Sequence, residues 1–255
     1  MSARLARGLL EGGGEIEMPR TISPLARLQR LQERRDLIFA KARETQIHVG
    51  SGLQVGEEAG QQRGARRRRI ANDAMPPAQW EQFCRGWASN LVSNADGALY
   101  VCMSTKEWPL VSRVLAEEGG HWSDTIIWAK DRFVLGRADY QRQYEPIWYG
   151  WREGASHYWK GDRDQGDVWR IERPSESDLH PTTKPLALVE RALENSSRPG
   201  DAVLDLFLGS GSTLIAAERT GRACYGAEID PHYASIVILR WEAFTGETAE
   251  RTEIG

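Results

Sequence analysis

The sequence predicts an α/β protein with a doubly wound, mostly parallel sheet and an antiparallel hairpin at one edge. Strand-like apolar runs alternate with amphipathic helix-like segments from residue 76 onward, which is typical of a parallel sheet covered by helices. A glycine-rich turn joins one of these runs to a helix at residues 209–211. Two further runs, at 125–130 and 145–151, are joined by a polar loop and indicate the hairpin.

The individual elements follow from hydrophobic periodicity and from the prolines and glycines that bound it. We expect helices at 76–91, 107–118, 185–196, 212–219 and 231–244, and strands at 97–103, 125–130, 145–151, 202–208 and 223–229. Nine of the ten tryptophans lie between Trp80 and Trp169, whereas residues 1–65 contain one aromatic side chain, Phe39. We therefore divide the chain into an N-terminal segment, 1–64, and a main domain, 65–255. Within the former, we expect a short helix at 23–35, a strand at 36–40 and a loop at 48–64.

Composition limits the classes of function. The 255 residues, 40% of them hydrophobic, suffice for one domain with a sizeable core. The net charge of −3 means that nucleic-acid binding would require a local basic patch. We expect no transmembrane helix, since no apolar run reaches about 18 residues, and no signal peptide. Cys84, Cys102 and Cys224 are widely separated, which disfavours zinc or a disulfide framework and makes the cytoplasm the expected location.

The segment 203–230 carries the strongest functional signal. A strand-like run ends at Asp205, turns through Gly209-Ser210-Gly211 into a helix, and is followed by a second strand ending at Glu228. Glycines allow the backbone to turn tightly and approach a ligand, and an acid after the next strand can accept hydrogen bonds from a ribose. The pattern therefore predicts a nucleoside-containing cofactor, with a turn that binds no ligand as the alternative.

The identity of that cofactor follows from charge. Leu214 occupies the place of the third glycine of a dinucleotide fingerprint, and Asp205 suits a cationic ligand better than a pyrophosphate. S-adenosylmethionine carries a sulfonium and an ammonium group and no phosphate. A second segment, His180-Pro181-Thr182-Thr183-Lys184-Pro185, supplies polar side chains but by itself predicts only the start of a helix.

Together, HPTTKP at 180–185, DLFLGSGSTLIAAE at 205–218 and GAEIDPHY at 226–233 resemble the amino-group DNA methyltransferases, which methylate adenine N6 or cytosine N4. Their order resembles the permuted subclass, in which the cofactor motif follows the catalytic half. IANDAM at 70–75, GALYVCMS at 97–104 and DTIIWAKDRF at 124–133 extend the resemblance over roughly residues 65–244. It implies methyl transfer from S-adenosylmethionine to an exocyclic amine of a flipped base in double-stranded DNA, with adenine favoured.

The resemblance also implies residue roles. The methionine end and sulfonium of the cofactor would contact Asp205, Phe207, Gly209, Ser210 and Gly211 from one side and His180, Thr182 and Lys184 from the other. Glu228 would hold the ribose hydroxyls. Trp128 and Lys130 would lie near the flipped base, with core packing as the alternative for Trp128. No metal site is implied.

The catalytic signature of the family, an acid, Asn or Ser followed by Pro-Pro and an aromatic residue, is not recognisable. The one Pro-Pro pair, Pro76-Pro77, resembles a helix start. The signature's polar head and a backbone carbonyl accept the amine hydrogens, and its aromatic ring stacks on the base. The segment 36–40 resembles the strand that leads into it, which lies in the family between the strands at 202–208 and 97–103. We therefore expect its position near Lys41, Ala42, Arg43 and Glu44; one hypothesis is that residues before about 65 are mistranslated.

Basic residues indicate how DNA would bind. Arg66, Arg67, Arg68 and Arg69 form the densest positive cluster and are expected to contact phosphates, with a solvated loop as the alternative. Arginines and aromatic residues also interleave over 132–170, which suits DNA contact or ordinary packing of a hairpin.

Three functions are compatible with these patterns. The first is a DNA amino methyltransferase, acting alone, as a homodimer or with a separate specificity partner. The second is an inactive remnant or partner subunit that keeps the cofactor and DNA sites, favoured by the missing signature. The third is a nicotinamide-dependent oxidoreductase, favoured only by the glycine turn.

Overall fold

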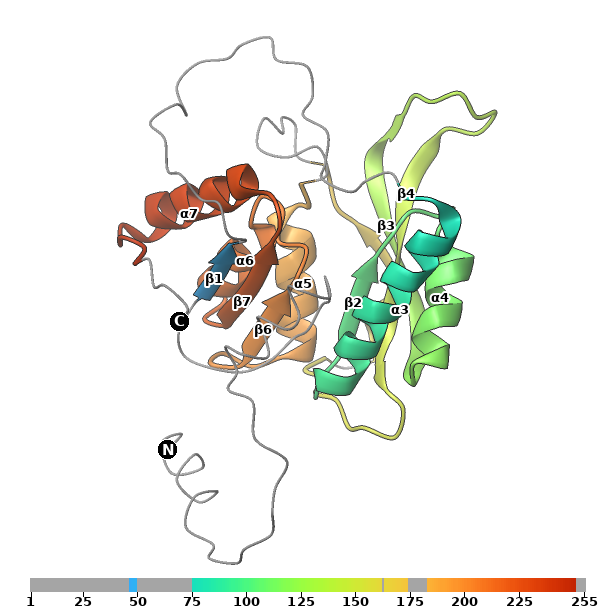
Figure 1. The fold of residues 1–255 in the computed structure, drawn as a ribbon, viewed down its shortest axis with the longest axis horizontal. Helices are drawn as coiled ribbons and strands as arrows, with labels where there is room; N and C mark the ends of the chain where they lie inside the picture. Colours follow the sequence, from blue (N-terminus) through green and yellow to red (C-terminus); the bar gives the residue numbers. More distant parts are fainter. Residues whose placement is uncertain (1–45, 50–74, 162, 174–182, 251–255) are drawn as a thin grey trace, which may run out of the picture.

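The computed structural model describes residues 46–49, 75–161, 163–173 and 183–250, which form two β-sheets and five helices (Figure 1). One sheet has three strands in the order β1-β7-β6, and the other has four strands in the order β2-β4-β3-β5. This arrangement confirms the α/β class. The antiparallel part is larger than a hairpin at one edge, because it includes β2, β3 and β4.

The three-stranded sheet is entirely parallel. It consists of β1 (Gln46–Val49), β7 (Ala223–Glu228) and β6 (Ala202–Asp205), with β7 in the centre. The strand β1 corrects the expectation of a loop at 48–64, because His48 and Val49 pair with Ala227 and Glu228. A run of four residues that contains Gln46 and His48 is too short and polar for a periodicity argument to identify.

The four-stranded sheet is built around a long hairpin. Its strands β3 (Gly120–Val134) and β4 (Arg142–Arg152) pair antiparallel, with β2 (Leu99–Cys102) beyond β4 and β5 (Val168–Arg170) parallel to β3. Both hairpin strands are longer than the apolar runs that predicted them. The extra residues at the turn include exposed Arg132, Arg142 and Phe133 and form no continuous apolar run, so hydrophobicity does not mark them as strand.

The helices begin and end close to the expected positions. They are α3 (Pro77–Asn94), α4 (Trp108–Glu117), α5 (Leu186–Ser196), α6 (Ser212–Arg219) and α7 (Pro231–Thr245) in the described part, and three of them have proline in the first turn, where its missing N–H costs nothing. Asp230 caps α7 by accepting a hydrogen bond from the backbone N–H of His232 at 2.9 Å. The Pro76-Pro77 pair is confirmed as a helix start.

Side chains of the helices join the two sheets. A core cluster from α3, α4 and β2 also contains Leu204 and Leu206, which belong to β6 and the turn after it. On the opposite side, α5 contributes Leu188 to the cluster on the four-stranded sheet and Leu193 to the cluster between β6, α6 and α7. The sheets are therefore sandwiched between helices that contact both of them.

The strands β6 and β2 face each other without pairing. Among the described residues, β6 pairs only with β7 and β2 pairs only with β4. The expected strand at 36–40, like the expected helix at 23–35 and the boundary at residue 65, lies outside the described residues. The strand β1 nevertheless shows that part of the N-terminal segment belongs to the sheet.

Candidate active site

The glycine turn between β6 and α6 depends on backbone conformations that favour glycine. Gly209 has φ of 56° and Gly211 has φ of 81°, both in the left-handed region. A Cβ atom added to Gly211 would lie 3.0 Å from a methyl carbon of Val237, which is fully buried on α7. The turn is thus held against α7, and Gly211 leaves no room for a side chain.

Asp205, the last residue of β6, is fixed beneath this turn. One carboxylate oxygen accepts a hydrogen bond from the backbone N–H of Phe207 at 3.0 Å, and the other accepts one from the Thr213 hydroxyl at 2.6 Å. Burial raises the pKa of Asp205, against the lowering effect of these bonds and of Lys184. A cationic ligand at this position would favour the ionised carboxylate.

Glu228 joins the second strand of the motif to the turn. Its Oε2 accepts a hydrogen bond from the backbone N–H of Gly209 and its Oε1 accepts one from that of Asp230, both at 2.8 Å. The side chain is 9% exposed, and burial raises its pKa. Each carboxylate oxygen has a further lone pair, so Glu228 can hold the turn and accept a ligand hydroxyl at the same time.

The HPTTKP segment meets the glycine turn through two hydrogen bonds. The hydroxyls of Thr183 and Ser210 lie 3.1 Å apart, and the Ser212 hydroxyl donates to the backbone carbonyl of Lys184 at 2.9 Å. Ser210 is 3% exposed, and its carbonyl accepts a hydrogen bond from Arg240 on α7. Two motifs separated by about twenty residues in the sequence therefore form one continuous surface.

Lys184 leads from this surface to the four-stranded sheet. Its ammonium group lies 2.8 Å from one carboxylate oxygen of Glu145, and the Lys130 ammonium lies 2.5 Å from the other. Trp128 is opposite Glu145 in the β3–β4 register, so the two side chains share a face. Both ammonium groups lie over the Trp128 ring, at 4.6 Å for Lys130 and 5.6 Å for Lys184.

This group, which we call the Glu145 cluster (Trp128, Lys130, Glu145 and Lys184), is partly shielded from water, with Glu145 23% and Lys184 27% exposed. The Lys130 side chain is 8% exposed and Trp128 is 3% exposed. Burial by itself would raise the pKa of Glu145, but the two lysines outweigh it and the net pKa is lowered. The ring expected near a flipped base is thus covered by two cations in this structure.

The other residues expected at the site are distributed as follows. Phe207 is half exposed at the turn, and its ring centroid lies 5.9 Å from that of Phe83 on α3. The residues that lie outside the described part are His180, Thr182, Lys41, Ala42, Arg43, Glu44, Arg66, Arg67, Arg68 and Arg69. In the part of the chain that is described, no three His, Cys, Asp or Glu side chains are grouped to hold a metal ion.

Three residues at the site are not identified by the sequence analysis: Glu145, Thr183 and Thr213. Glu145 is the first residue of the predicted strand 145–151 and belongs to no motif, so its role depends on pairing between β3 and β4. Thr183 and Thr213 lie inside the two recognised motifs, and a hydroxyl inside a motif is a signal for a hydrogen bond at the site. Their partners, Ser210 and Asp205, are separated from them in sequence, so the motifs alone do not indicate which groups they bind.

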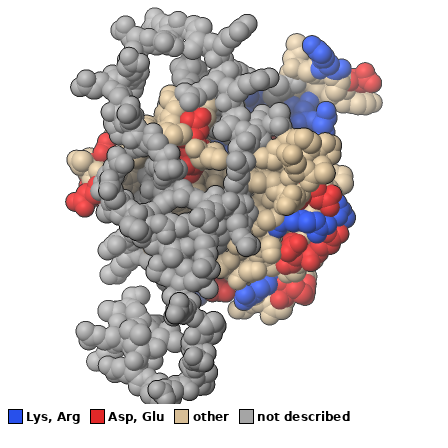
Figure 2. All heavy atoms as spheres, in the orientation of Figure 1, with Lys and Arg blue, Asp and Glu red and all other residues tan. Residues whose placement is uncertain are grey.

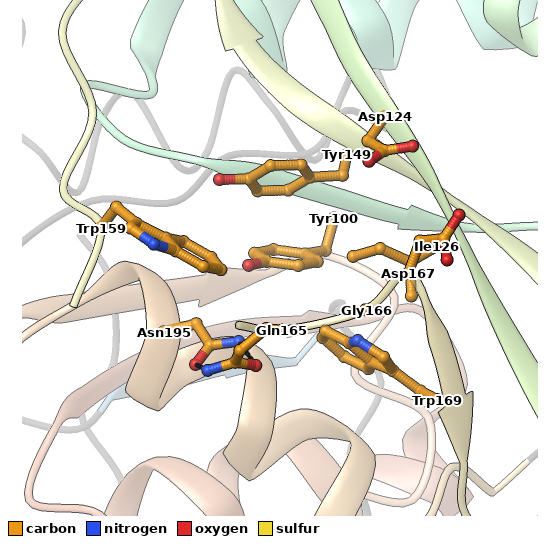
Figure 3. Close-up of a pocket in the computed structure, with 10 residues that line it drawn as sticks. All are labelled: Tyr100, Asp124, Ile126, Tyr149, Trp159, Gln165, Gly166, Asp167, Trp169 and Asn195. Atoms are coloured by element: carbon orange, nitrogen blue, oxygen red, sulfur yellow. Dashed lines mark hydrogen bonds between the residues drawn. The ribbon is translucent and has the colours of Figure 1, made fainter. Parts of the chain in front are cut away.

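A separate hollow lies on the four-stranded sheet, and Trp169 in its wall pairs in register with Trp128 (Figure 3). Its walls include Tyr100, Tyr149 and Trp169, and Gln165 and Asn195 exchange two hydrogen bonds of 2.9 Å at its edge. The charged residues that line it are acidic, Asp124 and Asp167, without a basic one. The lining of this hollow is therefore unsuited to phosphate, whereas the neighbouring Glu145 cluster contains two cations.

Comparison with known proteins places the chain in a family. The family model for N6/N4 methylases, described as DNA methylase, matches residues 55–239. The DNA adenine methyltransferase YhdJ of Escherichia coli is 27% identical over 62% of this chain and 65% of its own length. The type II methyltransferase M2.DpnII of Streptococcus pneumoniae is 30% identical over 48% of this chain and 43% of its own length. The alignments thus span less than two thirds of these relatives.

Solved structures show the same fold. The complex of M1.HpyAVI with SAM aligns with a TM-score of 0.55 and 24% identity, covering 65% of this chain and 85% of that one. The PvuII cytosine-N4-specific DNA methyltransferase aligns with a TM-score of 0.56 and 16% identity, covering 80% and 81%. The family match covers well over half of the sequence, from before α3 into α7. The chain accordingly belongs to the N6/N4 family of DNA methylases.

Proposed function

We propose that this chain binds S-adenosylmethionine at the glycine turn and presents its methyl group to an exocyclic amine in duplex DNA, adenine N6 in preference to cytosine N4. The cofactor assignment rests on two hydrogen bonds, between the hydroxyls of Thr183 and Ser210 and from the Ser212 hydroxyl to the Lys184 carbonyl. They bring the HPTTKP segment and the glycine turn together as one surface. The relative named as a DNA adenine methyltransferase supports the choice of base. A nicotinamide cofactor is disfavoured because the Asp205 carboxylate lies at the turn, where a pyrophosphate would have to bind, and Leu214 replaces the third glycine of the dinucleotide fingerprint.

The chemistry of the described residues fits the ends of this cofactor. Asp205 offers a carboxylate to a ligand ammonium or sulfonium, and the Lys184 ammonium can pair with a ligand carboxylate. Glu228 has acceptor capacity for ribose hydroxyls. The half-exposed Phe207 ring provides an apolar surface beside them. When bound, the cofactor supplies an activated methyl group, and the protein's part is to orient it and to exclude water.

The amine needs separate activation, since its lone pair is delocalised into the base. In the described part, no carboxylate followed by Pro-Pro and an aromatic residue is present, and Pro76-Pro77 starts α3. We therefore propose that the chain as written binds cofactor and DNA but transfers methyl groups slowly or not at all. The inactive binding protein thus remains the second candidate, favoured by this observation.

The position of β1 limits which segment of the sequence can form a catalytic strand between β6 and β2. Strands in a sheet lie about 4.8 Å apart, so that position is about 14 Å from β1, beyond β7 and β6. A parallel strand at 36–40 would also have to return about 16 Å along its own length to reach Gln46. The straight line, about 21 Å, is at the limit of what the six Cα–Cα steps from residue 40 to Gln46 can span, about 20–22 Å. It also passes through the sheet, and a path around the sheet would be longer. Residues 50–74 have no such restriction, so we propose that the strand belongs there.

Two engineered chains test this proposal. In the first, residues 41–44 are replaced by Asp-Pro-Pro-Tyr; in the second, residues 56–64 are replaced by Asp-Leu-Ile-Phe-Ala-Asp-Pro-Pro-Tyr. Transfer of labelled methyl groups to unmethylated duplex DNA is measured for both and for the original chain. We expect activity only in the second, with labelled N6-methyladenine as the product.

The possible outcomes separate the alternatives. Strong transfer by the original chain would show that other residues activate the amine, and rescue by the first replacement would place the strand at 36–40. A matched replacement of 56–64 that ends in Asp-Ala-Ala-Ala instead of Asp-Pro-Pro-Tyr controls for the inserted apolar strand. If neither replacement gives activity while both chains bind the cofactor, the proposed position is wrong.

A further inference from the structure

The turn of the β3–β4 hairpin combines exposed arginines and exposed apolar side chains at the same end of the sheet as the Glu145 cluster. We propose that this hairpin tip, residues 131–144, is the surface that grips the DNA duplex beside the active site. The inference rests on the proposed function, because it assigns the DNA contact of that same site. Figure 1 shows the tip projecting away from both helical layers.

The reach of the tip follows from the register. Trp128 pairs with Glu145 at the level of the cluster, and β3 continues to Val134 while β4 begins at Arg142. The six residues of β3 after Trp128, if fully extended, place the turn of the hairpin about 20 Å from the Glu145 cluster. A β-bulge between Ala129 and Val134 bends the ladder there. An arm of this length spans roughly the width of a DNA duplex from its base beside the cofactor site.

The charge of the tip suits phosphate. Arg132, Arg137 and Arg142 are exposed, and neither Arg137 nor Arg142 forms an ion pair with any described residue. Figure 2 shows blue atoms and some red ones on this projecting region, which also contains Asp131 and Asp139, and a denser mixture of red and blue over the helices below it. In those helices the arginines are already paired: Arg85 and Arg113 each contact Glu81 and Glu117. The unpaired cations of the hairpin are therefore free to release counterions from DNA.

The apolar side chains of the tip are not covered by the part of the chain that the structure describes. Leu135 is 82% exposed and Tyr140 is 93% exposed, far above the exposure of aromatic residues in the rest of the sheet. Rings and aliphatic side chains between arginines are suited to sugars and base faces in a groove. A second copy of this chain could also cover such side chains. The three arginines of the tip outnumber Asp131 and Asp139, however, so two tips facing each other across a two-fold axis would bring together like net charges.

The turn is preorganised for binding. The Gln141 side chain accepts a hydrogen bond from the backbone N–H of Gly136 at 2.6 Å and donates to the carbonyl of Ala138 at 2.7 Å. Gln143 donates across the hairpin to the carbonyl of Lys130 at 3.1 Å. These bonds fix the loop without using the arginines, so less ordering entropy is lost on binding.

The test measures binding of the full-length chain to a fluorescein-labelled, unmethylated duplex of about 20 base pairs at several salt concentrations. The variant carries Arg137→Gln and Arg142→Gln. We expect its Kd to rise about tenfold or more, and the slope of log Kd against log salt to decrease by about 2. Arg152→Gln is the matched control for Arg142→Gln, because Arg142 and Arg152 are the first and last residues of the same strand. The control should bind like the original chain.

Two further measurements keep the outcomes distinct. Affinity for S-adenosylhomocysteine, measured by calorimetry, should be equal in all three chains, which shows that the fold and cofactor site are intact. Leu135→Ser with Tyr140→Ser should weaken DNA binding and leave the sedimentation mass unchanged. A halved mass with unchanged DNA affinity would make the tip a contact between copies and overturn the inference.

Two further outcomes separate failure of the hairpin inference from failure of the proposed function. If the original chain binds DNA and the arginine variant binds equally well, the inference fails while the proposed function stands. If the original chain binds S-adenosylhomocysteine but not the duplex at any salt concentration, both the hairpin assignment and the DNA-directed part of the proposed function are wrong.

Discussion

The glycine turn and the Glu145 cluster are neighbours joined by Lys184, yet they are held together in different ways. The turn is fixed by backbone conformation and short hydrogen bonds, such as those of Asp205 to Phe207 and Thr213. The cluster is fixed by ion pairs between long side chains from β3, β4 and the segment before α5. The first arrangement tolerates almost no change of shape, whereas the second depends on the balance of charge. Substitutions should therefore act differently in the two regions.

The largest effect is expected at Gly211. Gly211→Val forces a β-branched residue into the left-handed region and into Val237, which should lower the free energy of unfolding by about 3 kcal/mol and abolish cofactor binding. Urea unfolding measures the former and calorimetry the latter. Gly154→Val is the control, because Gly154 has φ of 73° and open space around its Cα. Equal losses in both variants would show that packing against α7 contributes nothing.

A smaller loss is expected in the cluster. Glu145→Ala leaves two ammonium groups facing each other over Trp128 and should cost about 2 kcal/mol, since the group is partly open to solvent. Glu145→Gln keeps the shape and should cost less. Urea unfolding checks both, with the exposed Glu153→Gln as control. If Ala and Gln variants are as stable as the original chain, the ion pairs do not hold this region together.

The pH dependence of cofactor binding is a further property in which the glycine turn should differ from the Glu145 cluster. Because burial raises the pKa of Asp205, the carboxyl binds its proton more tightly in the folded chain than in the unfolded one. Its contribution to stability is thus present at low pH and is lost as pH rises from its unfolded to its folded pKa. A cationic ligand requires the ionised form, so affinity for S-adenosylmethionine should rise over the same range. Calorimetry from about pH 4 upward checks this, because the range begins at the ordinary pKa of an aspartate. Asp205→Asn should flatten the profile, and a profile unchanged in this variant would show that Asp205 does not cause the pH dependence.

The smallest effect is expected on the surface of α3 and α4. Glu117→Gln breaks exposed contacts with Arg85 and Arg113 that compete with water and salt. Thermal unfolding should hardly change, and any change should vanish at high salt. A salt-independent loss as large as that of Glu145→Ala would mean that exposure does not separate the two networks.

The glycine turn and the Glu145 cluster also differ in how far the sequence alone predicts them. The glycine turn, Asp205, Glu228 and the start of α5 were predicted because each depends on local backbone requirements. Glu145 was not, because its role depends on a strand register that brings residues from 128 to 184 together. The strand β1 escaped prediction because its four residues have no apolar pattern and are stabilised by pairing with β7. Local rules identify such turns, whereas long-range pairing of charges requires the fold.

The central claim is that the HPTTKP segment and the glycine turn form one site for S-adenosylmethionine. The most direct measurement is calorimetric titration of the original chain and of Thr183→Val with S-adenosylmethionine, its demethylated product and NAD. The account predicts that the first two ligands bind and NAD does not, and that removing the Thr183 hydroxyl beside Ser210 weakens binding several-fold. Tight NAD binding that S-adenosylhomocysteine does not displace would contradict it.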